Sequence, residues 1–187
     1  MSKILSEWKT LAQMGAPILL AQLAQMANGV IDTVMAGHAS AKDLAGVGIG
    51  TSLWVPVLLF FTGVLSALQP NISGFKGAGS FEKIMPCLWQ GIYIALFSSL
   101  LMILILVEID PIFVLLKLDA ETQLIAEGYL SAFAWGVPAI LMMIALRGLT
   151  DGTGRTQVFM GFSILISLIN MPLNYAFIYG FYMGLFR

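Results

Sequence analysis

The chain has 187 residues, of which 59% are hydrophobic and 10% are charged, and its mean hydropathy is +0.92. A soluble domain carries about 25% charged residues, so this chain lacks the polar side chains that a water-facing surface requires. A formal net charge of −1 provides no basic field, which excludes nucleic acid as a partner. The single cysteine, Cys87, excludes a scaffold of internal disulfides. The composition therefore predicts a polytopic protein in the lipid bilayer, with room for five or six spans of about 20 residues each.

Five apolar segments of spanning length follow a polar N-terminal stretch at 1–10. They lie at about 11–36, 44–74, 84–107, 122–146 and 156–180. The breaks at 37–43, 75–83, 108–121 and 147–155 contain the Gly, Asp or Ser residues that are frequent at helix ends. The run Leu96–Val107 is apolar on every side, which favours helices over barrel strands with alternating polarity. We predict an all-α polytopic membrane protein with about five transmembrane helices.

Lysine and arginine residues predict the orientation of these helices. Basic residues are more frequent in cytoplasmic segments than in external ones. If the N-terminus is cytoplasmic, the cytoplasmic segments hold six basic residues, namely Lys3, Lys9, Lys76, Lys83, Arg147 and Arg155. The external segments then hold three, namely Lys42, Lys117 and Arg187. This bias predicts a multi-pass protein with its N-terminus in the cytoplasm.

The first span carries a polar face. A carboxylate at the bilayer centre costs about 2.5–3.5 kcal/mol on insertion scales, so Asp32 requires an explanation. At about 100° per residue, five positions fall within an arc of about 120°, namely Gln22, Gln25, Asn28, Gly29 and Asp32. This stripe favours a bundle interior or an aqueous cavity for Asp32. The alternative is that Asp32 lies close enough to the helix end to reach interfacial water.

The last span carries a narrower polar stripe, which consists of Ser163, Ser167, Asn170 and Asn174. The two serines are typical of hydrogen bonds between membrane helices. Asn170 and Asn174 lie one turn apart, and their amide oxygens are hard ligands of the type that small cations prefer. If the first and last spans face each other, Asp32 would join them in one cavity that binds H⁺ or Na⁺. The alternative is a polar cluster that only fixes packing.

The spans also contain six prolines, which are Pro17, Pro56, Pro70, Pro86, Pro138 and Pro172. Proline removes a backbone hydrogen bond and kinks a helix, and bent helices are common where transporters move. Pro17 is the hinge candidate, because it lies on the span that carries Asp32. The sequence contains no nucleophile elbow, no Ser/His/Asp set and no paired histidines on one helix face, so we expect no enzyme and no bound cofactor.

Several segments resemble one known family. These are Pro17-Ile-Leu-Leu-Ala-Gln22 with Val30-Ile-Asp-Thr-Val-Met-Ala-Gly37, then Ala145-Leu-Arg-Gly-Leu-Thr-Asp-Gly152, and then Asn170-Met-Pro-Leu-Asn-Tyr-Ala-Phe-Ile-Tyr-Gly180. Together they resemble the multidrug and toxic compound extrusion (MATE) transporters, especially the bacterial NorM-like branch. The resemblance covers essentially the whole chain.

The resemblance implies a fold of twelve helices in two six-helix lobes, in a protein of the bacterial inner membrane. The family exports small amphiphilic cations in exchange for Na⁺ or H⁺. By position, Asp32 matches the family's essential carboxylate and Asn170 matches an asparagine of its ion site. Asn174 lies where some members have Asp, which leaves the choice of ion open. Pro17 matches a proline about which the first helix is proposed to bend.

On this resemblance, 11–187 is expected to form most of the N-terminal lobe, with a C-terminal lobe missing. The expected parent function is a secondary active antiporter that exports cationic, amphiphilic drugs, and we expect this chain alone to be inactive. Two alternatives remain open. One is a membrane scaffold or partner-binding subunit without transport of its own, and the other is a flippase of lipid-linked precursors.

Overall fold

The computed structural model describes Trp8, Leu11, 15–27, 29–30, Val34, 41–116 and 118–175. In this part of the chain the regular structure is helical and no strand is present. A helix over Gly15–Ala27 is followed by α2 (Ala41–Ser66), α3 (Leu68–Gly77), η1 (Phe81–Lys83), α4 (Ile84–Val107), α5 (Asp110–Leu116), α6 (Ala120–Gly152) and α7 (Thr156–Tyr175). The prediction of an all-α fold is confirmed.

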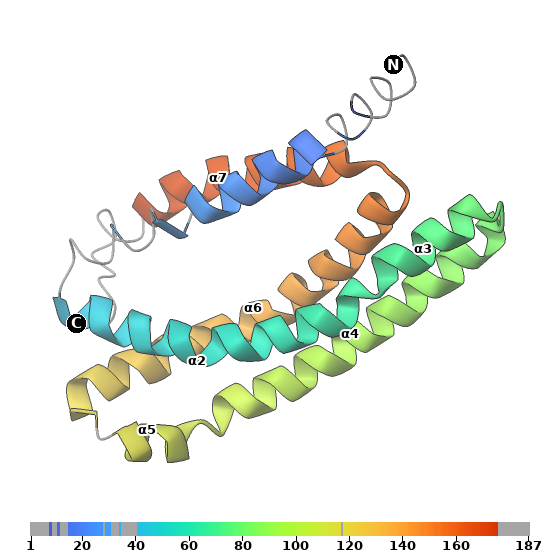
Figure 1. The fold of residues 1–187 in the computed structure, drawn as a ribbon. Helices are drawn as coiled ribbons and strands as arrows, with labels where there is room; N and C mark the ends of the chain where they lie inside the picture. The colour runs from blue at the N-terminus through green and yellow to red at the C-terminus, as the bar shows by residue number, and fades with distance from the viewer. Residues whose placement is uncertain are drawn as a thin grey trace.

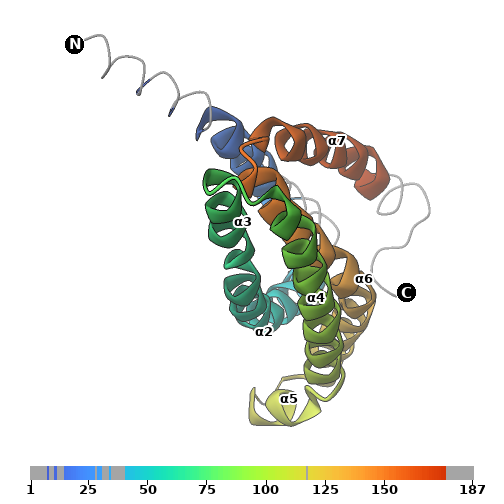
Figure 2. The ribbon, with the colours of Figure 1, turned by 90° about the vertical axis from the view of Figure 1, so that its right-hand side faces the viewer.

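Helix α6 is the centre of the arrangement, because α2, α3 and α4 all pack against it. These four helices form an elongated bundle, with α5 at one end and the turn from α3 to α4 at the other (Figure 1). α7 returns from the end of α6 and, among α2 to α6, packs mainly on that helix. In Figure 2, α2 lies to the left of α4, α6 appears behind α4 at the right, and α7 leaves the bundle near the top.

Three segments are long and apolar enough to cross a membrane, and these are Leu44–Gly77, Phe81–Val107 and Ala120–Gly152. The helices over Gly15–Ala27 and Thr156–Asn170 are also apolar but shorter in the described residues. Each of the five apolar segments in the sequence therefore contains a helix. Because most side chains in the three long segments are not buried within the bundle, their apolar surfaces suit a lipid environment.

Two of the predicted breaks differ from the structure. The stretch 108–121 was expected to be a loop but contains α5, because Ile109 and Phe113 lie one helical turn apart and are both buried in the core. The break at 147–155 is shorter than expected, because α6 continues to Gly152. An ion pair between Arg147 Nε and Asp151 Oδ2, 3.1 Å long, supports this last stretch of helix. The chain then reverses at Gly154, whose φ of 76° suits glycine.

The predicted segment 44–74 is divided in two at Ala67. Pro70 explains the division, because it has no N–H to bond the carbonyl group of Ser66 and its ring crowds that carbonyl. The ladder resumes with the N–H of Asn71, which donates to Ala67 O at 3.4 Å. Pro86 lies in the first turn of α4, where a missing N–H has no intrahelical partner to lose. Thus the two prolines have different effects on the helices.

The tightest packing joins α3 to its neighbours through glycines. Leu68 lies against Gly91 of α4 and Gly148 of α6, and a Cβ atom at either glycine would press on its side chain. Ile72, which is fully buried, packs on Gly152 near the end of α6. A Cβ atom at Gly152 would also lie 2.9 Å from the backbone oxygen of Gln69, which cannot move without shifting α3. The approach of α3 to α6 therefore depends on the missing side chain.

We expect Gly152→Ala to lower the stability of the chain, because overpacking of a close contact typically costs about 1–3 kcal/mol. The measurement is thermal unfolding in detergent, followed by loss of the monodisperse species. Gly161→Ala is the matched control, since nothing lies within 4 Å of a Cβ atom at that position of α7. The control should unfold at the original temperature or above, and equal losses in both variants would contradict the role of Gly152.

Candidate functional site

The polar face predicted for the first span lies only partly in the described residues. Gln22 and Gln25 are exposed on the helix over Gly15–Ala27, and Pro17 is buried. Asn28 and Asp32 lie outside the described residues. The role of Pro17 as a hinge and the position of Asp32 in a cavity therefore stay predictions.

The polar stripe predicted for the last span lies on α7. Ser163 is buried, and Ser167 and Asn170 are half-buried. The Ser167 hydroxyl group donates to the carbonyl oxygen of Ser163 at 2.9 Å, within its own helix. Asn174 belongs to α7, but its side chain lies outside the described residues. A joint ion site of Asp32, Asn170 and Asn174 therefore stays a prediction.

Clusters of three or more His, Cys, Asp or Glu that could hold a metal ion are absent from the described part of the chain. The predicted Na⁺ site differs from such a cluster, since it combines one carboxylate with two amide oxygens. Oxygen ligands of this kind suit a hard cation.

A half-buried aromatic cluster between α2 and α6 was not predicted from the sequence. Trp54 of α2 stacks on Phe133 of α6 with a centroid distance of 4.2 Å and an interplanar angle of 23°. Tyr129 stacks against the same Phe133 at 6.5 Å. The Tyr129 hydroxyl group accepts hydrogen bonds from Thr51 Oγ1 at 3.4 Å and from Trp54 Nε1 at 3.3 Å. We call Thr51, Trp54, Tyr129 and Phe133 the aromatic cluster.

A glycine permits this cluster to form. A Cβ atom at Gly50 would lie 2.6 Å from the ring of Tyr129, so α2 and α6 approach closely because this side chain is missing. The only visible signal in the sequence was that Tyr129 and Phe133 lie four residues apart and share one helix face. Chemically, aromatic faces attract organic cations, and a half-buried hydroxyl group adds one polar contact.

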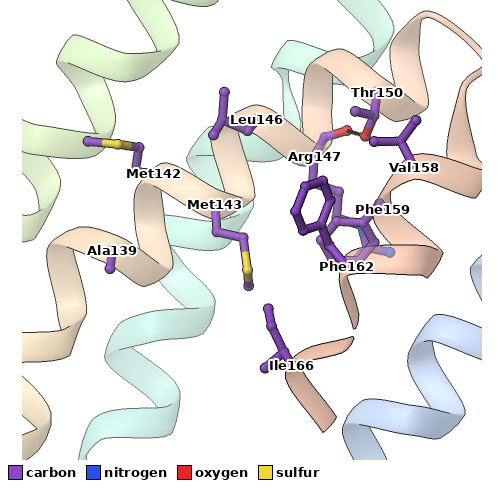
Figure 3. Close-up of a pocket in the computed structure, with 10 residues that line it drawn as sticks. All are labelled: Ala139, Met142, Met143, Leu146, Arg147, Thr150, Val158, Phe159, Phe162 and Ile166. Atoms are coloured by element: carbon purple, nitrogen blue, oxygen red, sulfur yellow. Dashed lines mark hydrogen bonds between the residues drawn. The ribbon is translucent and has the colours of Figure 1, made fainter. Parts of the chain in front are cut away.

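A cavity of about 330 Å³ lies between α6 and α7 (Figure 3). Its lining is almost entirely apolar and consists of Ala139, Met142, Met143, Leu146, Arg147, Thr150, Val158, Phe159, Phe162 and Ile166. Arg147 is the charged member of this lining. Its guanidinium carbon lies 4.4 Å from the centroid of the Phe159 ring, within the range of a cation–π contact. The cavity therefore combines a large apolar wall with one cation.

Arg147 and Asp151 form an asymmetric pair. The side chain of Arg147 is 26% exposed, whereas that of Asp151 is 5% exposed. Asp151 Oδ2 accepts from Arg147 Nε, while Oδ1 is buried and has no hydrogen-bond partner among the described residues. A molecule that enters the cavity therefore meets the guanidinium group before the carboxylate.

Comparison with known proteins supplies the family context. The profile of the MatE family matches residues 17–176. Over 174 residues the chain is 41% identical to "Probable multidrug resistance protein NorM" of Pasteurella multocida, a match that covers 93% of this chain and 38% of that protein. Over 183 residues it is 39% identical to "Multidrug resistance protein MdtK" of Yersinia pestis, with coverage of 96% and 40%. The chain thus spans about two fifths of the length of these relatives.

Two solved structures share the fold. One is described as a MOP superfamily transporter from Pyrococcus furiosus, and the other as an outward-facing multidrug resistance MATE family transporter. Each superposes with a TM-score of 0.88 at 20% sequence identity, over 94% of this chain and 39% of the other. At this identity the similarity establishes the fold.

We expect Tyr129→Phe to destabilise the chain by about 1 kcal/mol, because Thr51 and Trp54 lose the oxygen to which they donate. For a chain of this size that change lowers the unfolding temperature by about 2–4 °C. Tyr93→Phe is the matched control, since Tyr93 is 65% exposed on α4. An unchanged unfolding temperature in Tyr129→Phe would contradict a structural role for this hydroxyl group.

Proposed function

This chain belongs to the MatE family, and from that premise we propose that it is part of a secondary active transporter that exports cationic, amphiphilic compounds. The observation that carries the proposal is the identity of about 40% to two multidrug resistance proteins over more than nine tenths of the chain. Because the chain spans 38–40% of those proteins, the activity is proposed for the transporter of which this lobe is a part. No enzymatic step is proposed.

The aromatic cluster supports amphiphilic cations as the substrate class. Stacked aromatic faces bind flat apolar molecules and attract a positive charge, which a purely aliphatic surface does not. The half-buried state of Trp54, Tyr129 and Phe133 leaves part of each ring accessible. Gln22 and Gln25 are exposed and would supply polar contacts on the same lobe. Such a surface tolerates many shapes, because stacking and dispersion are less directional than hydrogen bonds.

Ion coupling is assigned in this proposal to Asp32, Asn170 and Asn174. A carboxylate within a span can hold either a proton or a cation, and the amide oxygens of the two asparagines would complete the shell of Na⁺. When Asp32 takes up H⁺ or Na⁺, its charge is neutralised and its preferred surroundings change. A bend of the first helix near Pro17 would couple that change to release of the substrate.

The proposed orientation places the N-terminus in the cytoplasm of a bacterium, with the lobe in its inner membrane. Lys76 Nζ donates to Thr153 O at 2.5 Å, so the α3–α4 turn and the α6–α7 turn lie at the same end of the bundle. That end also carries Lys83, Arg147 and Arg155. Such an excess of basic residues is typical of cytoplasmic segments. Lys3, Lys9, Lys117 and Arg187, as well as the side chain of Lys42, lie outside the described residues.

The test is a chimera in which this chain replaces the matching segment of the Pasteurella multocida relative. In a drug-sensitive bacterium we expect the chimera to restore efflux of ethidium, an amphiphilic cation, and we expect Asp32→Asn to reduce that efflux to background. Trp135→Ala is the control, because Trp135 is 89% exposed and lies outside the aromatic cluster. A chimera that reaches the membrane without efflux, or an Asp32→Asn variant with full efflux, would refute the proposal.

The coupling ion is tested separately in proteoliposomes that contain the chimera. Asn170→Ala should lower transport driven by a Na⁺ gradient at least tenfold if the amide oxygen is a ligand, since truncating the ligand removes one partner of the cation. A proton gradient should drive the same variant nearly as well as the original. Equal effects under both gradients would assign Asn170 to packing of α7 instead of ion binding.

A further inference from the structure

We propose that the cavity between α6 and α7 binds an anionic phospholipid, with one acyl chain in the cavity and the phosphate group on Arg147. The proposal does not depend on the transport activity, because the lining of this cavity includes neither the aromatic cluster nor the predicted ion-site residues. Three observations carry it, namely the shape and lining of the cavity, the free donors of Arg147, and the depth and charge of this end of the bundle.

The cavity suits an acyl chain. Its volume of about 330 Å³ lies at the lower end of the range of about 300–1,000 Å³ for small-molecule sites. Met143 and Ile166 extend from opposite helices toward this space (Figure 3). The ring of Phe159 lies against the Arg147 head group. Val158, Phe162 and Ile166 are between 45% and 59% exposed, so the cavity merges with an exposed apolar face of α7. An apolar face of this kind suits an acyl chain.

Arg147, the cation in the lining of the cavity, has hydrogen-bond donors that its ion pair does not use. Only the Nε of Arg147 is bonded, to Asp151 Oδ2, so both terminal nitrogens lack a hydrogen-bond partner among the described residues. Guanidinium groups bind phosphate through paired charge-assisted hydrogen bonds. The carboxylate of Asp151 is 5% exposed and lies behind the guanidinium group, which disfavours a cationic ligand at this place. The exposed chemistry is therefore that of an anion site.

Arg147 also lies at the right depth for a lipid head group. Helix α6 has 33 residues and is roughly 50 Å long at 1.5 Å per residue, whereas the hydrocarbon core is about 30 Å thick. Its last two turns, which contain Arg147, therefore reach the head-group region. Lys76, Lys83 and Arg155 lie at the same end of the bundle. The opposite end, around α5, carries four carboxylates, namely Glu108, Asp110, Asp119 and Glu121. Anionic lipids are thus attracted to the end where the cavity lies.

The experiment measures lipid binding to the 187-residue chain by native mass spectrometry from detergent micelles. Phosphatidylglycerol and phosphatidylcholine with the same two acyl chains are titrated in parallel. We expect the first phosphatidylglycerol molecule to bind about tenfold more tightly than the first phosphatidylcholine molecule. The choline cation of phosphatidylcholine competes with Arg147 for the phosphate group, whereas phosphatidylglycerol has no such cation. The double variant R147Q/D151N should abolish this preference, and it leaves no unpaired buried charge since it removes both members of the ion pair.

Lys83→Gln is the matched control, because Lys83 is an exposed cation at the same end of the bundle but outside the cavity. It should keep the preference for phosphatidylglycerol. If Lys83→Gln loses as much of the preference for phosphatidylglycerol as the double variant does, the preference comes from diffuse surface charge, and the proposed site is refuted. Equal binding of both lipids by the original chain would overturn the proposal outright.

Two further variants keep the test decisive if the double variant loses helicity in circular dichroism. Arg147→Lys keeps the charge but not the paired donors, and we expect it to retain only part of the preference. Ala139→Phe places a ring in the cavity. It should weaken the binding of both lipids and leave the ratio of their affinities unchanged. Full binding of both lipids in Ala139→Phe would show that the acyl chain lies elsewhere and would overturn the proposal.

Discussion

The contact of α3 with three glycines is the constraint on which the rest of the bundle depends. In a bilayer, water does not drive apolar helices together, so association rests on close packing and on a few polar contacts. Leu68 fills the space that Gly91 and Gly148 leave open, and Ile72 does the same at Gly152. These contacts hold α4 and α6 to the same short helix. They also fix the end of the bundle at which Lys76 reaches the carbonyl oxygen of Thr153.

The same principle operates again along α6. Gly46 lies on Ile125 and Gly50 lies on the ring of Tyr129, so α2 approaches α6 through missing side chains as α3 does. At the first place an aliphatic side chain fills the gap, and at the second an aromatic side chain does. The aromatic cluster therefore results from the same close packing of a side chain on a glycine that holds the bundle together. Its rings are also held by the hydrogen bonds from Thr51 and Trp54 to the Tyr129 hydroxyl group. In this way one structural device positions both the core and the candidate substrate surface.

The sequence predicted the helices well and their ends less well. Apolar runs such as 84–107 coincide with α4, because length and hydropathy alone determine whether a helix can span a bilayer. The division at Ala67 was missed, since hydropathy does not register the hydrogen bond that Pro70 removes. α5 was missed because the charges at 108–121 suggested a loop, although Phe113 is buried. The aromatic cluster was missed because Trp54 and Phe133 lie far apart in the chain, and only packing brings their rings to 4.2 Å. The polar stripes follow from helical periodicity, but periodicity does not determine which helix faces another.

The number of basic residues at one end of the bundle does not by itself identify a binding site. The bias of six basic residues to three in the sequence predicts an orientation, because each basic residue raises the cost of crossing the membrane whether or not it has a partner. Binding depends instead on donors that remain free after folding. Lys76 already donates to Thr153 O, and the Nε of Arg147 is bonded to Asp151. At the cavity, the terminal nitrogens of the Arg147 guanidinium group remain available, and the group lies over the ring of Phe159. The pair with Asp151 therefore has two consequences, since it continues α6 to Gly152 and it orients the cation without neutralising the side that a lipid can reach.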